Sequence, residues 1–180
     1  MSATDSAALP PVQLSMLARP APGSLPDVEL PAGYVLRTYQ PGDEKGWAEV
    51  LRLAGFKDWS TDKCRDYLQE STRRRGSHLV ACGKKVVAVT FSTPHPEDPA
   101  VGLLDYVATH PDHRGCRLGR SVCAGVMRFF LAEGRPLVRL LTDDWRLPAI
   151  ALYLNLGFEP VMTRADMPAR WEAVFTQLGR

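Results

Sequence analysis

Apolar residues recur along the chain with two spacings, and the spacing separates predicted strands from predicted helices. Alternating or continuous apolar runs indicate strands, whereas apolar residues three or four positions apart indicate a helix with one buried face. The predicted strands are residues 34–39, 78–82, 86–92, 101–109, 137–142 and 159–162. The predicted helices are residues 44–54, 61–71, 118–133, the segment between Asp144 and Gly157, and residues 167–178.

Residues at the ends of these segments support the predicted boundaries. Asp43, Ser60 and Asp144 precede predicted helices, where a side-chain oxygen can accept a hydrogen bond from a free amide of the first turn. Gly134 and Gly157 follow predicted helices. Glycine ends helices because it readily takes the left-handed conformation found just after them.

The order of the elements predicts an α/β fold. Residues 78–82 and 86–92 flank a turn at Gly83-Lys84 and form a hairpin. From residue 34 to residue 162 the elements read β-α-α-β-β-β-α-β-α-β, and one more helix follows. Strands and helices interleaved in this way pack as a mixed sheet with helices on both faces.

The first 33 residues differ from the rest in composition. They hold six prolines and little charge, which favours an extended arm over a helix. Residues 13–19 alternate apolar and polar side chains and are expected either to add an edge strand, to the domain or to a partner subunit, or to be disordered. We therefore divide the chain into an arm, residues 1–33, and one domain, residues 34–180.

Composition excludes several classes of protein. A net charge of +2 does not favour nucleic acid as a partner, and no apolar run approaches the length of a membrane span. The N-terminus shows no secretory signal pattern. The four cysteines include no Cys-x-x-Cys pair, so we expect reduced thiols in a cytoplasmic protein.

The loop between strand 101–109 and helix 118–133 is a predicted anion site. It contains Arg114-Gly115-Cys116-Arg117-Leu118-Gly119. The first N–H groups of a helix have no partner inside the helix, and the helix dipole adds partial positive charge there. A strand that delivers a glycine-containing loop into a helix N-terminus therefore favours the binding of phosphate.

This loop and a later segment match two signatures of one family. The loop fits (Gln/Arg)-x-x-Gly-x-(Gly/Ala), except that Arg117 stands at the first motif glycine. Residues 149–158 fit Ala-x-x-Leu-Tyr-x-x-x-Gly-Phe, with Tyr153 as the tyrosine. Two motifs in this order are more specific than either alone. Over residues 34–161 the chain resembles the GNAT superfamily of acyl-CoA N-acetyltransferases.

The resemblance implies a fold and a co-substrate. The fold is a mixed, mostly antiparallel twisted sheet flanked by helices on both faces and splayed at its central strands. The co-substrate is acetyl-CoA, with its pyrophosphate on the loop amides, its pantetheine arm along the strand edge, and no metal. The expected cofactor-binding residues are Val107, Ala108, Thr109, Arg114, Gly115, Cys116, Arg117, Leu118, Gly119, Arg120 and Arg146.

Some of these residues have a second interpretation. Arg114, Arg117 and Arg120 recur every three residues, and at least one of them can simply face solvent. Arg146 can reach the phosphates or an acidic substrate, and the family often has asparagine at its position. Cys116 lies beside arginines at a helix N-terminus, which can lower the pKa of its thiol and allow a covalent acyl-cysteine route. The resemblance instead implies direct acetyl transfer.

Two residues are candidates for proton transfer. The tyrosine that matches Tyr153 protonates the departing thiolate in the family, although a core tyrosine is the alternative interpretation. Asp105 is a candidate base by geometry, because period-2 spacing would place it on one face with Leu103 and Val107. A surface or core-pairing aspartate is the alternative. His110 and His113 lie in a turn that is a poor frame for a metal.

The sequence thus predicts an enzyme that moves an acetyl group from acetyl-CoA to a primary amine by direct attack in a ternary complex. The alternative is a non-catalytic acyl-CoA-binding sensor. Two features are consistent with this alternative: Arg117 stands in place of the motif glycine, and the sequence does not identify the general base. The sequence carries no code for the acceptor amine. The chain is expected to be a monomer or a homodimer.

Overall fold

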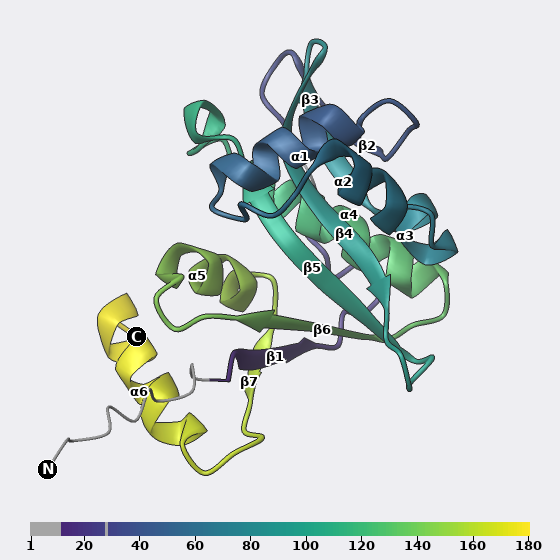
Figure 1. The fold of residues 1–180 in the computed structure, drawn as a ribbon. Coiled ribbons are helices and arrows are strands. Elements are labelled where there is room, and N and C mark those ends of the chain that lie inside the picture. The colour runs from purple at the N-terminus through teal and green to yellow at the C-terminus, as the bar shows by residue number, and fades with distance from the viewer. Residues whose placement is uncertain (1–11, 28) are drawn as a thin grey trace, which may run out of the picture.

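The structure is a computed structural model and describes residues 12–27 and 29–180. Within these residues one sheet has the strand order β2-β3-β4-β5-β6-β1-β7, and only β5 and β6 pair in parallel (Figure 1). The strands are β1 (Leu14–Ala18), β2 (Tyr34–Thr38), β3 (His78–Cys82), β4 (Lys85–Pro94), β5 (Val101–Thr109), β6 (Leu137–Thr142) and β7 (Glu159–Val161). The helices are α1 (Glu44–Leu53), α2 (Thr61–Tyr67), α3 (Ser71–Gly76), α4 (Leu118–Ala132), α5 (Leu147–Asn155) and α6 (Met167–Leu178), and a 3₁₀ turn spans Pro111–His113.

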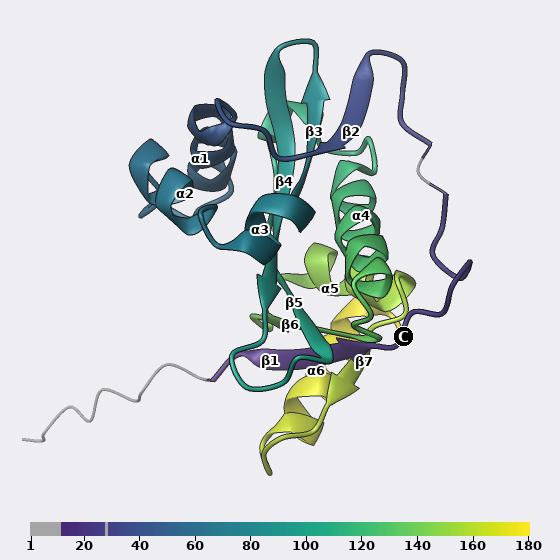
Figure 2. The same cartoon turned by 90° about the vertical axis from the view of Figure 1, so that its right-hand side faces the viewer.

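Helices cover both faces of the sheet, as Figure 2 shows from the side. On one face α1 buries Trp47, whose ring stacks on Phe91 of β4 with centroids 5.1 Å apart. On the other face α4 buries Val126 and Phe130 in a cluster that also includes residues of β1, β6, α5 and α6. The mixed α/β sheet predicted from the order of the elements is therefore confirmed.

The predicted helix over residues 61–71 is wrong, because the chain forms two short helices there. Ser60 caps α2 as expected and accepts a hydrogen bond from the Lys63 amide. Glu70 then caps α3 by accepting from the Thr72 and Arg73 amides at 2.9 Å. The Glu70 carboxylate thus binds the free amides at the start of a new helix. These amides would not be free in one continuous helix, so the capping favours a second helix that begins after Glu70.

Two predicted side-chain caps are also wrong, because both carboxylates have stronger partners. Asp43 precedes α1 but pairs with Arg37 through two 2.7 Å hydrogen bonds. Asp144 lies before α5 but pairs with Arg170 of α6 at 2.9 and 2.5 Å. Bidentate arginine pairs are stronger than a bond to a neutral amide, which explains both outcomes.

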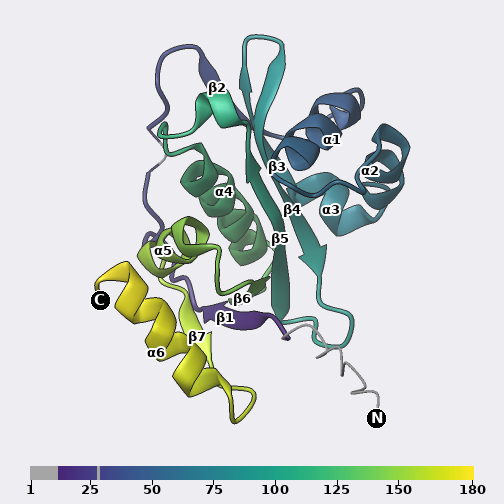
Figure 3. The same cartoon turned by 60° about the vertical axis from the view of Figure 1, so that its left-hand side comes forward.

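The strand expected at an edge of the sheet lies inside it. β1 pairs on one side with β6 and on the other with β7, both antiparallel. Leu14 and Met16 point into the core and are fully buried. The alternation of residues 13–19 indicates one buried face, but it carries no information about how many neighbours the strand has. The N-terminal segment thus completes the sheet in this part of the molecule (Figure 3).

Shortening Met16 tests this placement. We expect Met16→Ala to lower the free energy of unfolding by about 2–5 kcal/mol, because it leaves a cavity in a closed core. Val12→Ala is the control: this residue precedes the same strand but is 53% exposed, so its effect should stay within about 0.5 kcal/mol. Denaturant melts of both variants measure the difference. Equal small effects would contradict the interior position of β1.

The central strands separate toward one end of the sheet. β5 and β6 are paired only from Val101 with Leu137 to Leu103 with Arg139. Beyond this point β5 continues to Thr109 and β6 to Thr142 without further pairing to each other. The splay that the family resemblance implied is therefore present, and it opens the middle of the sheet.

A β-bulge in β5 lies beside this opening. Asp105 is opposite Phe91 of β4, but Ala108 is opposite Val89, so β5 has one extra residue between them. Tyr106 takes the left-handed conformation, with φ of 52°. The bulge reverses the alternation of the strand. Asp105 faces Tyr67 of α2, whereas Val107 packs on the α4 side, so the predicted common face of these two residues is wrong.

Candidate active site

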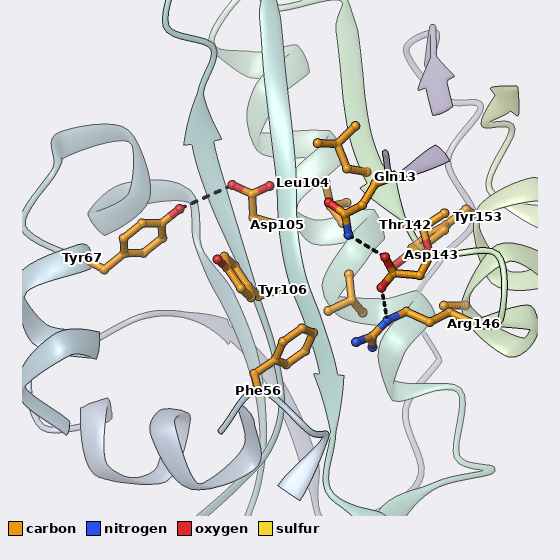
Figure 4. Close-up of a pocket in the computed structure, with 13 residues that line it drawn as sticks. Gln13, Phe56, Tyr67, Leu104, Asp105, Tyr106, Thr142, Asp143, Arg146 and Tyr153 are labelled. Atoms are coloured by element: carbon orange, nitrogen blue, oxygen red, sulfur yellow. Dashed lines mark hydrogen bonds and ion pairs between the residues drawn. The ribbon is translucent and has the colours of Figure 1, made fainter. Parts of the chain in front are cut away.

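A polar cavity of about 310 Å³ lies where β5 and β6 separate (Figure 4). Its walls come from four parts of the chain, since the splayed strands, the start of α5, the α1–α2 region and the N-terminal segment all contribute side chains. The lining residues are 104–107, 141–143, Arg146, Ala149, Tyr153, Gln13, Phe56 and Tyr67. We name this hollow the acceptor cavity.

A second, more apolar cavity of about 610 Å³ adjoins it. The end of β5, the loop before α4 and the start of α5 form its walls. The lining residues are 107–109, 113–115, 117–119, Ala54, 145–146, 148–149 and Leu152. We name this hollow the donor cavity. The two cavities share Val107, Arg146 and Ala149, so they meet at these three residues.

The loop of the donor cavity has the backbone of an anion site. A hydrogen bond of 2.9 Å between the Tyr34 hydroxyl and His113 Nδ1 fastens the 3₁₀ turn to β2. Gly115 has φ of 81°, and α4 begins without a side-chain cap among the described residues. A Cβ atom at Gly119 would lie 3.2 Å from Leu152 Cδ1, so glycine leaves the first turn of α4 open to close approach. These features fit a pyrophosphate.

Arg117 stands at the position of the family's first motif glycine and has a left-handed backbone conformation. It immediately precedes α4 with φ of 58°, in the left-handed region. A non-glycine residue in this conformation costs roughly 1–2 kcal/mol. The chain adopts this conformation at arginine despite its cost, and the Arg117 amide remains part of the loop.

Most of the predicted cofactor-binding residues line the donor cavity, and two do not. Cys116 instead packs on an apolar cluster around Leu118 and Val122. Arg120 lies in a neighbouring hollow with Arg117, and its buried Nε has no hydrogen-bond partner in the described part of the chain. The roles of all these residues stay predictions.

Tyr153 lines the acceptor cavity from α5. The residue is 6% exposed, and its hydroxyl has no hydrogen-bond partner among residues 12–27 and 29–180. Burial raises the pKa of Tyr153, the Cys123 thiol adds to this, and the positive charge of Arg146 opposes it. A tyrosine hydroxyl that lines a cavity and has no protein partner can hydrogen-bond to a ligand.

Asp105 lines the same cavity from β5. Burial raises the pKa of its carboxyl group, against the opposing effects of Thr93, Arg73 and Tyr67. The Tyr67 hydroxyl lies 3.4 Å from Asp105 Oδ2, and Arg73 lies over the Tyr67 ring. A carboxylate with a raised pKa is a better proton acceptor than one in water, which is what a general base requires.

Several residues of the acceptor cavity could not be assigned from the sequence. Gln13 donates to Asp143 at 3.0 Å, although the two residues are 130 positions apart. Phe56, Tyr67 and Tyr106 form an aromatic wall, with edge-to-face contacts such as the 5.2 Å pair of Phe56 and Tyr106. No motif marks these positions. The aromatic residues Phe56 and Trp59 between helices 44–54 and 61–71 are the one local signal.

No group of three or more His, Cys, Asp or Glu residues within residues 12–27 and 29–180 is placed to hold a metal ion. All four cysteines, which lie in the described part, are free thiols. No described helix has the length and apolar character needed to cross a membrane.

Comparison with known proteins agrees with this geometry. The sequence profile described as "Acetyltransferase (GNAT) family" matches residues 44–158. A mycothiol acetyltransferase of Thermobispora bispora is 30% identical over 152 residues, which cover 78% of this chain and 51% of the relative. The chain spans about half the length of the curated relatives it matches.

Solved structures share the fold at lower identity. A GCN5-related N-acetyltransferase of Sphaerobacter thermophilus has a TM-score of 0.67 and 22% identity, covering 84% of this chain and 50% of its own. Diaminobutyrate acetyltransferase EctA of Paenibacillus lautus, solved with its substrate and coenzyme A, has a TM-score of 0.60 and 17% identity, covering 68% and 73%. The chain belongs to the acetyltransferase (GNAT) family.

Proposed function

We propose that this chain transfers an acetyl group from acetyl-CoA to a primary amine by direct attack in a ternary complex. The observation that carries the proposal is the meeting of the donor and acceptor cavities at Val107, Arg146 and Ala149. A thioester held in one cavity can be reached from the other without a covalent enzyme intermediate. Family membership and the named activity of the relatives support this chemistry.

Acetyl-CoA would lie in the donor cavity. Backbone amides of residues 115–119 would bind its pyrophosphate at the start of α4, assisted by Arg114 or Arg117. The register shift leaves Tyr106 and Val107 without ladder partners on β4, and the pairing with β6 has already ended at Leu103. These unpaired positions support a role for the Val107 amide in polarising the thioester carbonyl.

The acceptor amine would lie in the acceptor cavity between Asp105 and Tyr153. Asp105 accepts the proton that the amine loses as its nitrogen bonds to the carbonyl carbon. The carbon–sulfur bond breaks, the electron pair leaves with the sulfur, and the Tyr153 hydroxyl protonates the sulfur. Proton return through solvent from Asp105 to Tyr153 restores both side chains.

A polar cavity with a buried carboxylate favours catalysis over the sensor alternative, because binding of acetyl-CoA alone does not require it. The acceptor would be a small molecule or a peptide amine. We further propose that the chain works in the cytoplasm, as a monomer or a homodimer, without nucleic acid or membrane as a partner.

Turnover tests the proposed function. The protein is incubated with acetyl-CoA and a panel of small primary amines and N-terminal peptides, and the free thiol of released CoA is followed with a thiol reagent. We expect amine-dependent release above the rate of acetyl-CoA hydrolysis. Tight acetyl-CoA binding with no amine-dependent release across the panel would favour the sensor instead.

Asp105→Asn tests the base. Because the pKa of Asp105 is raised, the carboxyl group becomes protonated, and inactive as a base, at a higher pH than an exposed aspartate. We expect kcat/KM of the wild type to fall as the pH drops through this raised pKa. Asp105→Asn should lower kcat/KM by about 10²-fold and remove this limb of the pH profile. A uniform fall with an unchanged profile would show that Asp105 is not the base.

A further inference from the structure

One polar side chain lies where the two cavities meet. Val107 and Ala149 present only apolar side chains at this junction, and Arg146 is the third shared residue. The inference that follows rests on the proposed function. With the pyrophosphate at residues 115–119 and the amine in the acceptor cavity, the thioester must cross the junction. Arg146 is therefore close to the atoms that react.

The guanidinium of Arg146 is fixed in place by groups on three sides. Its Nε donates to Asp143 Oδ2 at 3.0 Å, and the other oxygen of Asp143 accepts from Gln13 at 3.0 Å (Figure 4). Its Cζ lies 4.9 Å from the ring centre of Phe56 and 4.4 Å from that of Trp145. Such stacking orients a guanidinium without using its N–H groups.

The rest of the guanidinium stays available. The two terminal nitrogens of Arg146 donate to no acceptor within residues 12–27 and 29–180, and the side chain is only 25% exposed. Arg146 directly precedes α5, and Tyr153 lies two turns further along this helix. The positive charge of Arg146 opposes the rise in the pKa of Tyr153 that burial causes. Arg146 and Tyr153, the proposed general acid, are therefore close enough to influence each other near the junction of the two cavities.

We propose that Arg146 is a catalytic residue that contacts the sulfur of acetyl-CoA rather than its phosphates. When the carbon–sulfur bond breaks, the electron pair remains on the sulfur until the Tyr153 proton arrives. A fixed guanidinium beside the sulfur stabilises this negative charge at the moment it forms. The neutral asparagine that the family often has at this position would not supply this charge.

The product thiol provides a readout that does not depend on turnover. CoA is bound to the protein at saturation, and its thiolate is titrated by ultraviolet absorbance after subtraction of the protein titrated alone. A cation beside the sulfur lowers the thiol pKa, so we expect bound CoA to titrate at least about one pH unit below free CoA. Arg146→Gln should move the titration back by about one pH unit, and Arg146→Lys should keep most of the shift.

Measurements of affinity and rate distinguish a contact of Arg146 with the sulfur from a contact with the phosphates. We expect Arg146→Gln to lower kcat by about 10–10²-fold and to change the dissociation constant of acetyl-CoA less than about threefold. Arg114→Gln is the matched control on the phosphate loop. It should weaken CoA binding and leave the titration of bound CoA unchanged.

The outcomes are distinguishable. Bound CoA that titrates like free CoA, or a titration that Arg146→Gln leaves unchanged, would overturn the sulfur contact. Equal losses of affinity and turnover in Arg146→Gln would also overturn it and place Arg146 on the phosphates. Failure of the wild-type protein to bind CoA at all would overturn the proposed function itself.

Discussion

Gly119→Glu is expected to abolish acetyl-CoA binding while the protein stays folded. Gly119 lines the donor cavity in the first turn of α4, where an added Cβ atom would lie only 3.2 Å from Leu152 Cδ1. A glutamate would bring both bulk and negative charge to the proposed pyrophosphate site. We expect the dissociation constant to rise by at least about 10³-fold, which corresponds to about 4 kcal/mol.

Thermal melts measure this effect directly. Acetyl-CoA at about a hundred times its dissociation constant adds roughly 2.7 kcal/mol to the stability of the wild type. For a chain of this size, this raises Tm by about 5–10 °C. Gly119→Glu should show no rise, and free adenosine should give none with either protein. A normal rise for the variant would show that the phosphates bind elsewhere.

Two further variants separate charge from bulk. The side chain that Gly119→Gln introduces has nearly the same volume as that of Gly119→Glu but carries no charge, and Gly119→Ala adds only the Cβ atom. We expect affinity to fall in the order wild type, Gly119→Ala, Gly119→Gln, Gly119→Glu. Equal affinity of the glutamine and glutamate variants would mean that steric exclusion alone is responsible.

Tyr153→Phe is expected to lower kcat by about 10³-fold with little change in the affinity for acetyl-CoA. The hydroxyl is the one group that the substitution removes, and it has no hydrogen-bond partner among the described residues. Removing a hydroxyl that makes no hydrogen bond to the described protein costs no internal hydrogen bond. Tm should therefore stay the same or rise slightly, which makes the melt an internal control.

Kinetics with saturating amine separate the interpretations of Tyr153. A proton donor acts only in the transition state, so kcat and kcat/KM should fall together. If the dissociation constant of acetyl-CoA rose as much as kcat fell, Tyr153 would be a binding residue. If neither changed, it would be a core tyrosine whose hydroxyl has no function.

Local patterns predicted most of the elements, and the misses arise from contacts between distant residues. The 78–82 and 86–92 hairpin follows from period-2 spacing and its turn, and Ser60 caps α2 within three residues. Asp144 was a reasonable cap by position, but Arg170 lies close to it only in the folded chain. Cap prediction compares neighbours in sequence and cannot include such a competitor.

In the candidate active site, too, local motifs predicted some residues, and contacts between distant residues account for the others. The anion loop, Tyr153 and Arg146 belong to motifs or adjoin them, so their positions were predictable. Gln13 was not, because only the insertion of β1 beside β6 brings it to Asp143. The face of Asp105 was mispredicted relative to Val107, because one extra residue in β5 reverses the alternation. Nothing in the local sequence marks Tyr106 as the bulge.

The position of β1 has a consequence for how the chain folds during synthesis. β1 leaves the ribosome before its partners β6 and β7, which end at Thr142 and Val161. Pairing over such a sequence separation loses the conformational entropy of a long loop, and proteins dominated by such contacts fold slowly. The hairpin of β3 and β4 with α1 can form early. The part of the fold that holds Gln13 and Tyr153 can form only after β6 and β7 have emerged, and until then the apolar face of β1 stays exposed to chaperones.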